Sequence, residues 1–360
     1  MVIYMTKEKT YNIFLFLSTF TRGLVEVFSL VLLYKKGYSL DNLIFFLFLM
    51  YSLGILVNYI SLKIYYKVIL IISSLIYGLS FIYLSNMNIS LISLSILAIL
   101  LSSGNYSYHA IRHFLALTML ETKKKNTSKL IIINYLGIIS ASLIGMYLID
   151  NLPFIVTSII IFTLSSISIL PILKQKKIII PNKEFNKKVI LPKNKIIFNI
   201  LEQFKVIFLE LQPLFLYIYI DKSIYYVGIF NVITNIASLI VIYFISSKLN
   251  NKYFKYYTLI LGLIFILKLN IKSGLILLFI AFLEGIFVKI YENTSLSNLY
   301  NYNNNSISSY LLVEELIFFI SKSLIMLIYL LLNLNIYTIM YINIVGIIIS
   351  GLFIKENKNH

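Results

Sequence analysis

The sequence contains no cysteine and no tryptophan, and only 12% of its 360 residues are charged. Without cysteine the chain has no disulfides, thiolate metal ligands or cysteine nucleophiles. A soluble domain needs about a quarter of its residues charged to cover its surface, so the low charge content indicates lipid as the solvent. Hydrophobic residues make up 59% of the chain, and its mean hydropathy is +0.90. This composition predicts an all-α integral membrane protein that crosses the bilayer many times.

Apolar runs of about 20 residues, the length that crosses about 30 Å of hydrocarbon, recur along nearly the whole chain. The first run lacks a small-residue cleavage site and is too long for a signal peptide, so we expect it to remain as a span. Twelve transmembrane helices are predicted, at residues 10–34, 43–64, 68–85, 91–117, 130–150, 154–173, 196–220, 229–249, 256–270, 275–297, 310–334 and 338–354. The longest polar connection, KQKKIIIPNKEFNKKVILPKNK, is a basic cytoplasmic linker at 174–195. It separates an N-terminal six-helix bundle at 1–173 from a C-terminal six-helix bundle at 196–360.

The net charge of +17 follows from an uneven distribution of lysines between the two sides of the membrane. With both termini in the cytoplasm, 21 lysines lie on that side. Five lie on the outer side: Lys35, Lys36, Lys222, Lys268 and Lys272. Basic loops stay in the cytoplasm, so we expect a cytoplasmic-membrane protein with cytoplasmic N- and C-termini. The charge then needs no nucleic-acid partner to explain it.

Ionisable residues inside the spans concentrate in spans 1, 4, 7 and 10, with a further group in span 11. They are Arg22, Glu26, His109, Arg112, His113, Glu202, Lys205, Glu210, Glu284, Lys289, Glu292, Glu314, Glu315 and Lys322. A charge at the bilayer centre costs at least about 2.5 kcal/mol, so these side chains should face a cavity or a partner. The period of three spans predicts that spans 1, 4, 7 and 10 line a central polar space, as in the repeats of secondary transporters.

The two six-span halves, the basic linker and this charge period resemble the major facilitator superfamily (MFS). The resemblance covers almost the whole chain. The stretch NYISLKIYYK after span 2 resembles the family's Gly-x-x-x-Asp-Arg-x-Gly-Arg-Lys loop, with Lys63 and Lys67 in basic slots and Leu62 in place of the acid. The stretch SKLNNKYFKY after span 8 is a second copy, with Lys252 beside Asn251. The resemblance implies alternating access between two bundles, with Lys63, Lys67 and Lys252 at a cytoplasmic gate.

Span 5 contains GIISASLIG, which resembles the Gly-x-x-x-Gly-Pro-x-x-Gly signature of exporters in this superfamily. Gly137 and Gly145 match the signature, whereas Ala141 and Ser142 replace its Gly-Pro. The resemblance favours export over uptake. Small residues at this spacing also serve plain helix packing, which is the alternative interpretation.

Five deep charges are candidates for the substrate cavity and for proton coupling: Arg22, Glu26, Glu210, Glu284 and Lys322. Two cations and three carboxylates nearly balance, as a buried polar space requires. Arg22 and Glu26 are four residues apart on one helix face, so we expect a local ion pair. Low dielectric disfavours a charged carboxylate and a nearby cation favours it, so substrate arrival could trigger protonation. The alternative is that Arg22 and Glu26 only neutralise each other.

His109, Arg112 and His113 fall within one turn of the cytoplasmic half of span 4. They are candidates for binding an anionic solute, for relaying protons, or for a cytoplasmic gate that pairs with Glu292 or Glu202. Alternatively, Arg112 extends to the lipid headgroups. No third ligand is evident, so no metal site is expected.

These patterns predict a monomeric secondary active transporter of a small organic solute, coupled to protons or possibly sodium, with no cofactor and no enzymatic activity. The absence of a glycine-rich phosphate loop excludes ATP-driven pumping within this chain. A lipid-linked oligosaccharide flippase remains an alternative. A membrane glycan-assembly enzyme is disfavoured because the outer loops, such as NMNIS and DNLP, are short. A receptor or scaffold is a further alternative.

Overall fold

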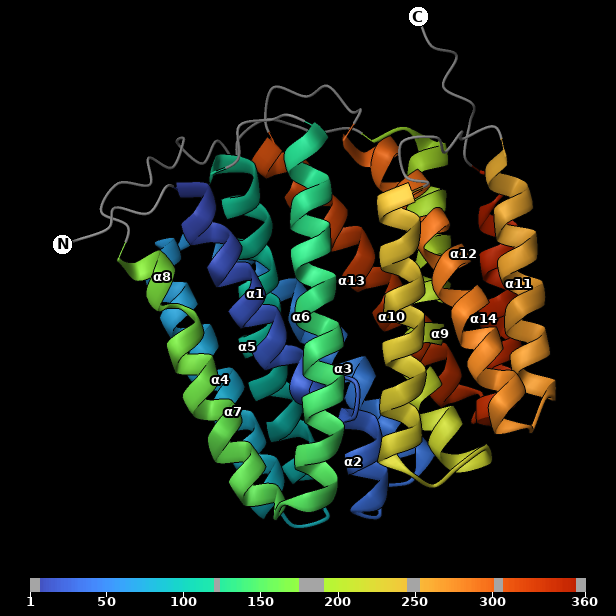
Figure 1. The fold of residues 1–360 in the computed structure, drawn as a ribbon, viewed down its shortest axis with the longest axis horizontal. Helices are drawn as coiled ribbons and strands as arrows, with labels where there is room; N and C mark the ends of the chain where they lie inside the picture. Colours follow the sequence, from blue (N-terminus) through green and yellow to red (C-terminus); the bar gives the residue numbers. More distant parts are fainter. Residues whose placement is uncertain (1–6, 120–123, 175–190, 245–252, 301–306, 354–360) are drawn as a thin grey trace, which may run out of the picture.

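The computed structural model describes residues 7–119, 124–174, 191–244, 253–300 and 307–353 (Figure 1). Within these ranges the regular secondary structure is almost entirely α-helical. The helices are α1 (Lys7–Glu26), α2 (Ser29–Lys35), α3 (Leu40–Lys63), α4 (Tyr66–Asn86), α5 (Leu91–Met119), α6 (Lys124–Asn151), α7 (Phe154–Ser168), α8 (Leu170–Leu173), α9 (Lys193–Tyr219), α10 (Ile224–Phe244), α11 (Phe254–Asn270), α12 (Gly274–Tyr300), α13 (Ile307–Leu331) and α14 (Ile336–Ser350).

Two pairs of these helices continue one another, so the fourteen helices of the described residues form twelve rods. Helices α1 and α2 make one span over Glu8–Lys35, and α7 and α8 make one over Phe154–Leu173. The second break comes at Pro171, whose ring cannot donate a helical hydrogen bond. Eight spans are long and apolar enough to cross a membrane by themselves, and α14 is a shorter apolar helix. Helices α9 and α13 are not among these eight spans because each carries several charges, and α11 is not among them because it has only 17 residues.

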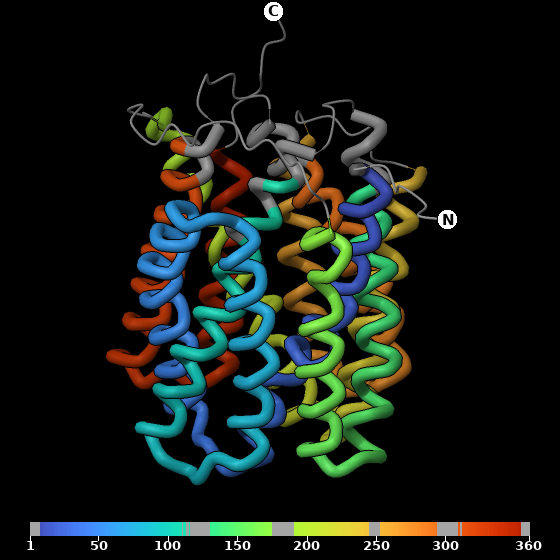
Figure 2. Tube along the Cα trace, turned by 90° about the vertical axis from the view of Figure 1, so that its left-hand side faces the viewer, coloured from blue at the N-terminus to red at the C-terminus, as the bar shows by residue number. Residues whose placement is uncertain are grey.

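The rods stand side by side in one bundle, with the first six on one side and the last six on the other (Figures 1 and 2). We call the end at which α1 begins and α14 ends the upper end, as drawn in Figure 1. Three packings join the two halves: α3 against α13, α6 against α10, and α2 against α9. The all-α prediction is confirmed, and several of the candidate site residues lie along these seams.

Helix α6 packs closely against α1 through small residues. Gly23 on α1 faces Ala141, and Gly145 faces the backbone of Leu24. A Cβ on Gly145 would lie 2.1 Å from the Leu24 carbonyl oxygen, so only glycine fits there. The small residues that resemble an exporter signature therefore have a packing role.

The outer surface carries large apolar side chains all around the bundle, among them Leu79, Ile92, Tyr147, Leu275 and Phe279, all of them exposed. A surface of this kind is unstable in water and matches lipid tails. The chain is therefore a multi-pass membrane protein.

Candidate functional site

The N-terminal half contributes a buried arginine, Arg22, held by α5. Its Nη1 donates to Asn105 Oδ1 at 3.0 Å and its Nη2 to the Gly104 carbonyl at 3.1 Å. The guanidinium also lies over the rings of Tyr77 and Tyr108, at 4.3 and 3.9 Å from their centroids. These contacts compensate the charge of a side chain that is only 6% exposed.

The expected direct ion pair between Arg22 and Glu26 is absent among the described contacts, and Asn105 stands between them. The Asn105 amide donates from Nδ2 to Glu26 Oε1 at 2.8 Å while its Oδ1 accepts from Arg22. An amide has both a donor and an acceptor, so it can bridge two opposite charges. The i, i+4 prediction was wrong because it considered one helix and ignored its neighbour.

The C-terminal half contributes Glu210 from α9 and Lys322 from α13. Lys322 Nζ lies 3.4 Å from Glu210 Oε1. It also lies 4.8 Å from the ring centroid of Tyr51, on α3 of the other half. Glu210 Oε2 is buried and has no hydrogen-bond partner among the described residues. Two of the predicted central residues are therefore adjacent, at the seam between the halves.

A second contact crosses the same seam. Asn58 on α3 donates to Glu315 on α13 at 3.4 Å. Glu26 is exposed and accepts the hydrogen bond of Asn105. We call Arg22, Glu26, Asn105, Glu210, Lys322, Asn58 and Glu315 the central cluster.

Glu284 makes no contact with the central cluster among the described contacts, but it lines a cavity between the two halves. Its Oε2 accepts from Lys268 Nζ at 2.6 Å, and both side chains are fully buried. The same ammonium donates to Gln212 Oε1 at 2.6 Å and lies 4.7 Å from the ring centroids of Phe208 and Phe265. The lysine distribution in the sequence places Lys268 among the lysines on the outer side of the membrane, and the structure buries its side chain within the bundle. It sits inside the second half and neutralises Glu284.

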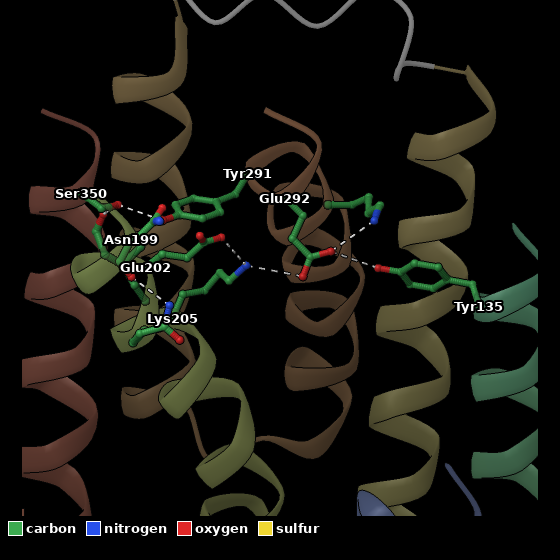
Figure 3. A network of polar contacts seen from close by, with 10 residues as sticks. Tyr135, Asn199, Glu202, Lys205, Tyr291, Glu292 and Ser350 are labelled. Carbon is green, nitrogen blue, oxygen red and sulfur yellow. Dashed lines mark hydrogen bonds and ion pairs between the residues drawn. The ribbon is translucent and has the colours of Figure 1, made fainter. Parts of the chain in front are cut away.

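Glu292, on the upper half of α12, lies between two lysines (Figure 3). Its carboxylate is 3.5 Å from Lys205 Nζ and 3.2 Å from Lys289 Nζ. Lys205 also pairs with Glu202 on its own helix at 3.7 Å. The first half reaches this group through Tyr135 on α6, whose hydroxyl donates to Glu292 at 3.4 Å. Helix α6 therefore supplies the cross-seam contact that was expected from α5.

Arg112 makes no ion pair with Glu292 or Glu202 among the described contacts. Its Nη1 donates to Asn134 Oδ1 at 3.5 Å, and its backbone carbonyl accepts from Tyr11. Arg112 lies about 32 Å along α5 from Leu91, toward the upper end of the bundle. The gate prediction for Arg112 therefore stays a prediction.

Of the remaining predicted gate residues, His109, Lys63 and Lys67 make no contact with Tyr135 or Glu292 among the described contacts. The His109 ring meets the edge of Tyr108 at 5.5 Å. Lys63 is exposed and lies over the ring of Tyr59 on its own helix, 3.9 Å from the centroid. Lys67 donates to the Leu173 carbonyl at 3.2 Å, which ties α4 to the end of α8. The side chain of His113 and residue Lys252 lie outside the described residues.

A cavity of about 550 Å³ lies between α1 and α6 of the first half and α9, α10 and α12 of the second. One wall is polar but uncharged, made by Asn134, Gln212, Asn231, Thr234, Asn235 and Ser238. Four of these follow one face of α10 at positions i, i+3, i+4 and i+7. We call these four residues, Asn231, Thr234, Asn235 and Ser238, the α10 stripe. This spacing is visible in the sequence, but a search for charges alone misses it.

Comparison of the sequence with protein-family models and with curated proteins gives no match. Among solved structures, the chain is similar to a mutant of the nucleoside transporter NupG, with a TM-score of 0.72 and 12% identity over 96% of this chain and 98% of that one. It is also similar to a bacterial homologue of the iron transporter ferroportin in an outward-facing state, with a TM-score of 0.63 and 10% identity over 97% and 98%. Sequence identities this low do not indicate a shared function. Structural similarity along the whole length of both chains does identify the fold. The chain has the major facilitator fold.

Proposed function

We propose that this chain is a secondary transporter that moves a small organic solute by alternating access between its two halves. The observation that carries the proposal is the central cluster, where Lys322 and Glu315 of the second half contact Tyr51 and Asn58 of the first half across the seam. Lys322 contacts Glu210 in its own half and the Tyr51 ring in the other. Charges at this depth are costly to retain for packing alone.

Proton coupling is proposed for Glu210. One of its oxygens faces Lys322 at 3.4 Å, and the other has no hydrogen-bond partner among the described residues. A proton on Glu210 would cancel its attraction for Lys322 and free the ammonium to strengthen its contact with the opposite half. Proton uptake would thereby change contacts across the seam, as coupling requires.

Contacts across the seam at both ends support two gates. At the lower end the Tyr34 ring on α2 meets the Tyr217 ring on α9, with centroids 6.4 Å apart. Nearer the upper end Tyr135 reaches Glu292. In the proposed cycle each contact breaks in turn, with both termini and the Glu292 gate on the cytoplasmic side.

Export is the proposed direction, on the resemblance of the Gly137 to Gly145 segment alone. The two similar structures are named for nucleoside and iron transport. A small organic solute fits the size and the polar wall of the cavity.

The test uses purified protein in liposomes with a trapped pH dye and a panel of amino acids, sugars, nucleosides, organic anions and cationic drugs. We expect one class to drive proton movement, and Glu210→Gln to abolish it while insertion and folding persist. Asp41→Asn, at an exposed carboxylate at the start of α3, is the control and should keep full flux. Full proton-driven flux in Glu210→Gln would refute the coupling assignment. Proton-independent solute flux that requires sodium would replace the coupling ion and leave the transporter standing.

A further inference from the structure

One wall of the cavity, made by Glu284, Gln212 and the α10 stripe, offers hydrogen-bond acceptors. All of them are uncharged except the Glu284 carboxylate, whose charge is neutralised by Lys268. We propose that this cavity binds an uncharged solute rich in hydroxyl groups, a class that includes sugars, polyols and nucleosides. The inference rests on the proposed transport function. It separates solute recognition at the cavity from proton coupling at the central cluster.

Glu284 is the first acceptor. Its Oε2 is taken by Lys268 at 2.6 Å, whereas Oε1 is buried with no hydrogen-bond partner among the described residues. A buried acceptor without a donor is destabilising, and a solute hydroxyl would supply that donor. Because Lys268 cancels the carboxylate charge, Glu284 acts here as an acceptor and does not demand a cation.

The α10 stripe extends this acceptor surface. Asn235 uses Nδ2 to donate to the Asn231 carbonyl at 2.7 Å, which leaves its Oδ1 without a donor in the part of the chain that the structure describes. Thr234 donates its hydroxyl to the Phe230 carbonyl at 3.0 Å and keeps its lone pairs for a ligand. Both side chains are partly exposed in the cavity wall.

Gln212 adds a donor to this surface. Its Oε1 accepts from Lys268, so its Nε2 is directed away from that ammonium. Three acceptors and one donor in one wall match a solute whose hydroxyl groups can both donate and accept.

Glu292, a second carboxylate at the cavity, is compensated by the protein. Glu292 has Lys205 and Lys289 as partners at 3.5 and 3.2 Å. Arg112 also lines the cavity, where its Nη1 donates to Asn134 Oδ1 at 3.5 Å. The wall made by Glu284, Gln212 and the α10 stripe has no uncompensated charge among the described residues, so a charged group of the solute at this wall would have no partner to offset its desolvation cost.

Binding is measured on the full-length protein in detergent by thermal unfolding followed by circular dichroism, since tryptophan and thiol signals are absent from this chain. The uncharged probes are D-glucose, myo-inositol and uridine. Their charged counterparts are gluconate, glucosamine and uridine monophosphate. We expect at least one uncharged probe to raise Tm in a concentration-dependent way, and its charged counterparts to fail.

Two conservative variants locate the effect. Thr234→Val and Asn235→Leu should each weaken the binding of that probe about fivefold, the typical effect of one lost hydrogen bond. Thr163→Val, on the exposed face of α7, is the matched control and should change nothing.

A charged probe that stabilises the protein as well as its uncharged counterpart would overturn the proposal, as would a complete lack of response to the uncharged probes. Unchanged binding in both α10 variants would do the same. If a charged solute is transported in liposomes, the proposal of an uncharged solute is refuted, whereas the proposal that the protein is a transporter is supported. If no solute of either class is transported, the proposed function itself falls.

Discussion

At the scale of single residues, Lys268 shows how helix geometry buries a charge. It lies two residues before the end of α11, and Glu284 lies ten residues into α12. Side chains lean toward the N-terminus of their own helix, and α11 and α12 run in opposite directions, so these two lean toward each other. Lys268, which the lysine distribution in the sequence places on the outer side of the membrane, therefore belongs to a core ion pair.

Removing one partner of this pair should be costly. We expect Lys268→Met to destabilise the protein by about 3–5 kcal/mol, because Glu284 would remain charged, buried and unpaired. The double variant Lys268→Met with Glu284→Gln should recover most of that loss. Chemical denaturation in detergent, followed by circular dichroism, measures both. A single variant as stable as the wild-type protein would show that the pair contributes little.

The same scale shows what the sequence could predict about the site. Glu210 and Lys322 were predictable as members of one central set because both are deep charges of opposite sign, but their direct contact was not, since it depends on α13 packing against α9. Asn105 was not, since an amide in an apolar span carries no charge to attract notice. Tyr135 was not either, because tyrosine is one of 29 in the chain and its position on α6 becomes meaningful only beside Glu292.

At the scale of elements, the helices were predictable from apolar runs because backbone groups in lipid must bond within their own segment. The span expected at 196–220 corresponds to α9 at Lys193–Tyr219. The break between α1 and α2 was not predictable, since neither proline nor glycine marks it. It falls directly after Glu26, whose carbonyl accepts from the Ser29 hydroxyl at 2.9 Å.

The close approach of α6 to α1 makes a prediction at this scale. Gly145→Ala should destabilise the protein by about 1–3 kcal/mol, because its Cβ would meet the Leu24 carbonyl and force the helices apart. Gly274→Ala is the control, since its Cβ would meet only the Tyr226 ring at 3.5 Å, an ordinary contact. Thermal unfolding of the two variants side by side measures the difference. Equal unfolding temperatures would contradict the packing role of Gly145.

At the scale of the whole molecule, two halves touch along three seams and close on each other at both ends. The division into halves was suggested by the basic linker and by the recurrence of charge every three spans, both of which are long-range features of the sequence. Which side chains would meet across the seam was not predictable, because it depends on how two separately packed bundles are set against each other.

The contact between Tyr34 and Tyr217 makes a prediction about the equilibrium between conformations that are open and closed at the lower end. Tyr34→Ala removes one ring from the lower gate and should favour opening at that end, while Tyr147→Ala, at an exposed tyrosine on α6, should not.

The measurement that tests alternating access most directly is the distance between spin labels at the lower end, one in each half. The chain has no native cysteine, so Asp41→Cys and Lys222→Cys, both at exposed positions, place the only two labels. Pulsed electron resonance in lipid nanodiscs should resolve a short and a long population that exchange weight with pH, and Tyr34→Ala should enrich the long one. A single distance distribution, unchanged by pH and by Tyr34→Ala, would contradict the account.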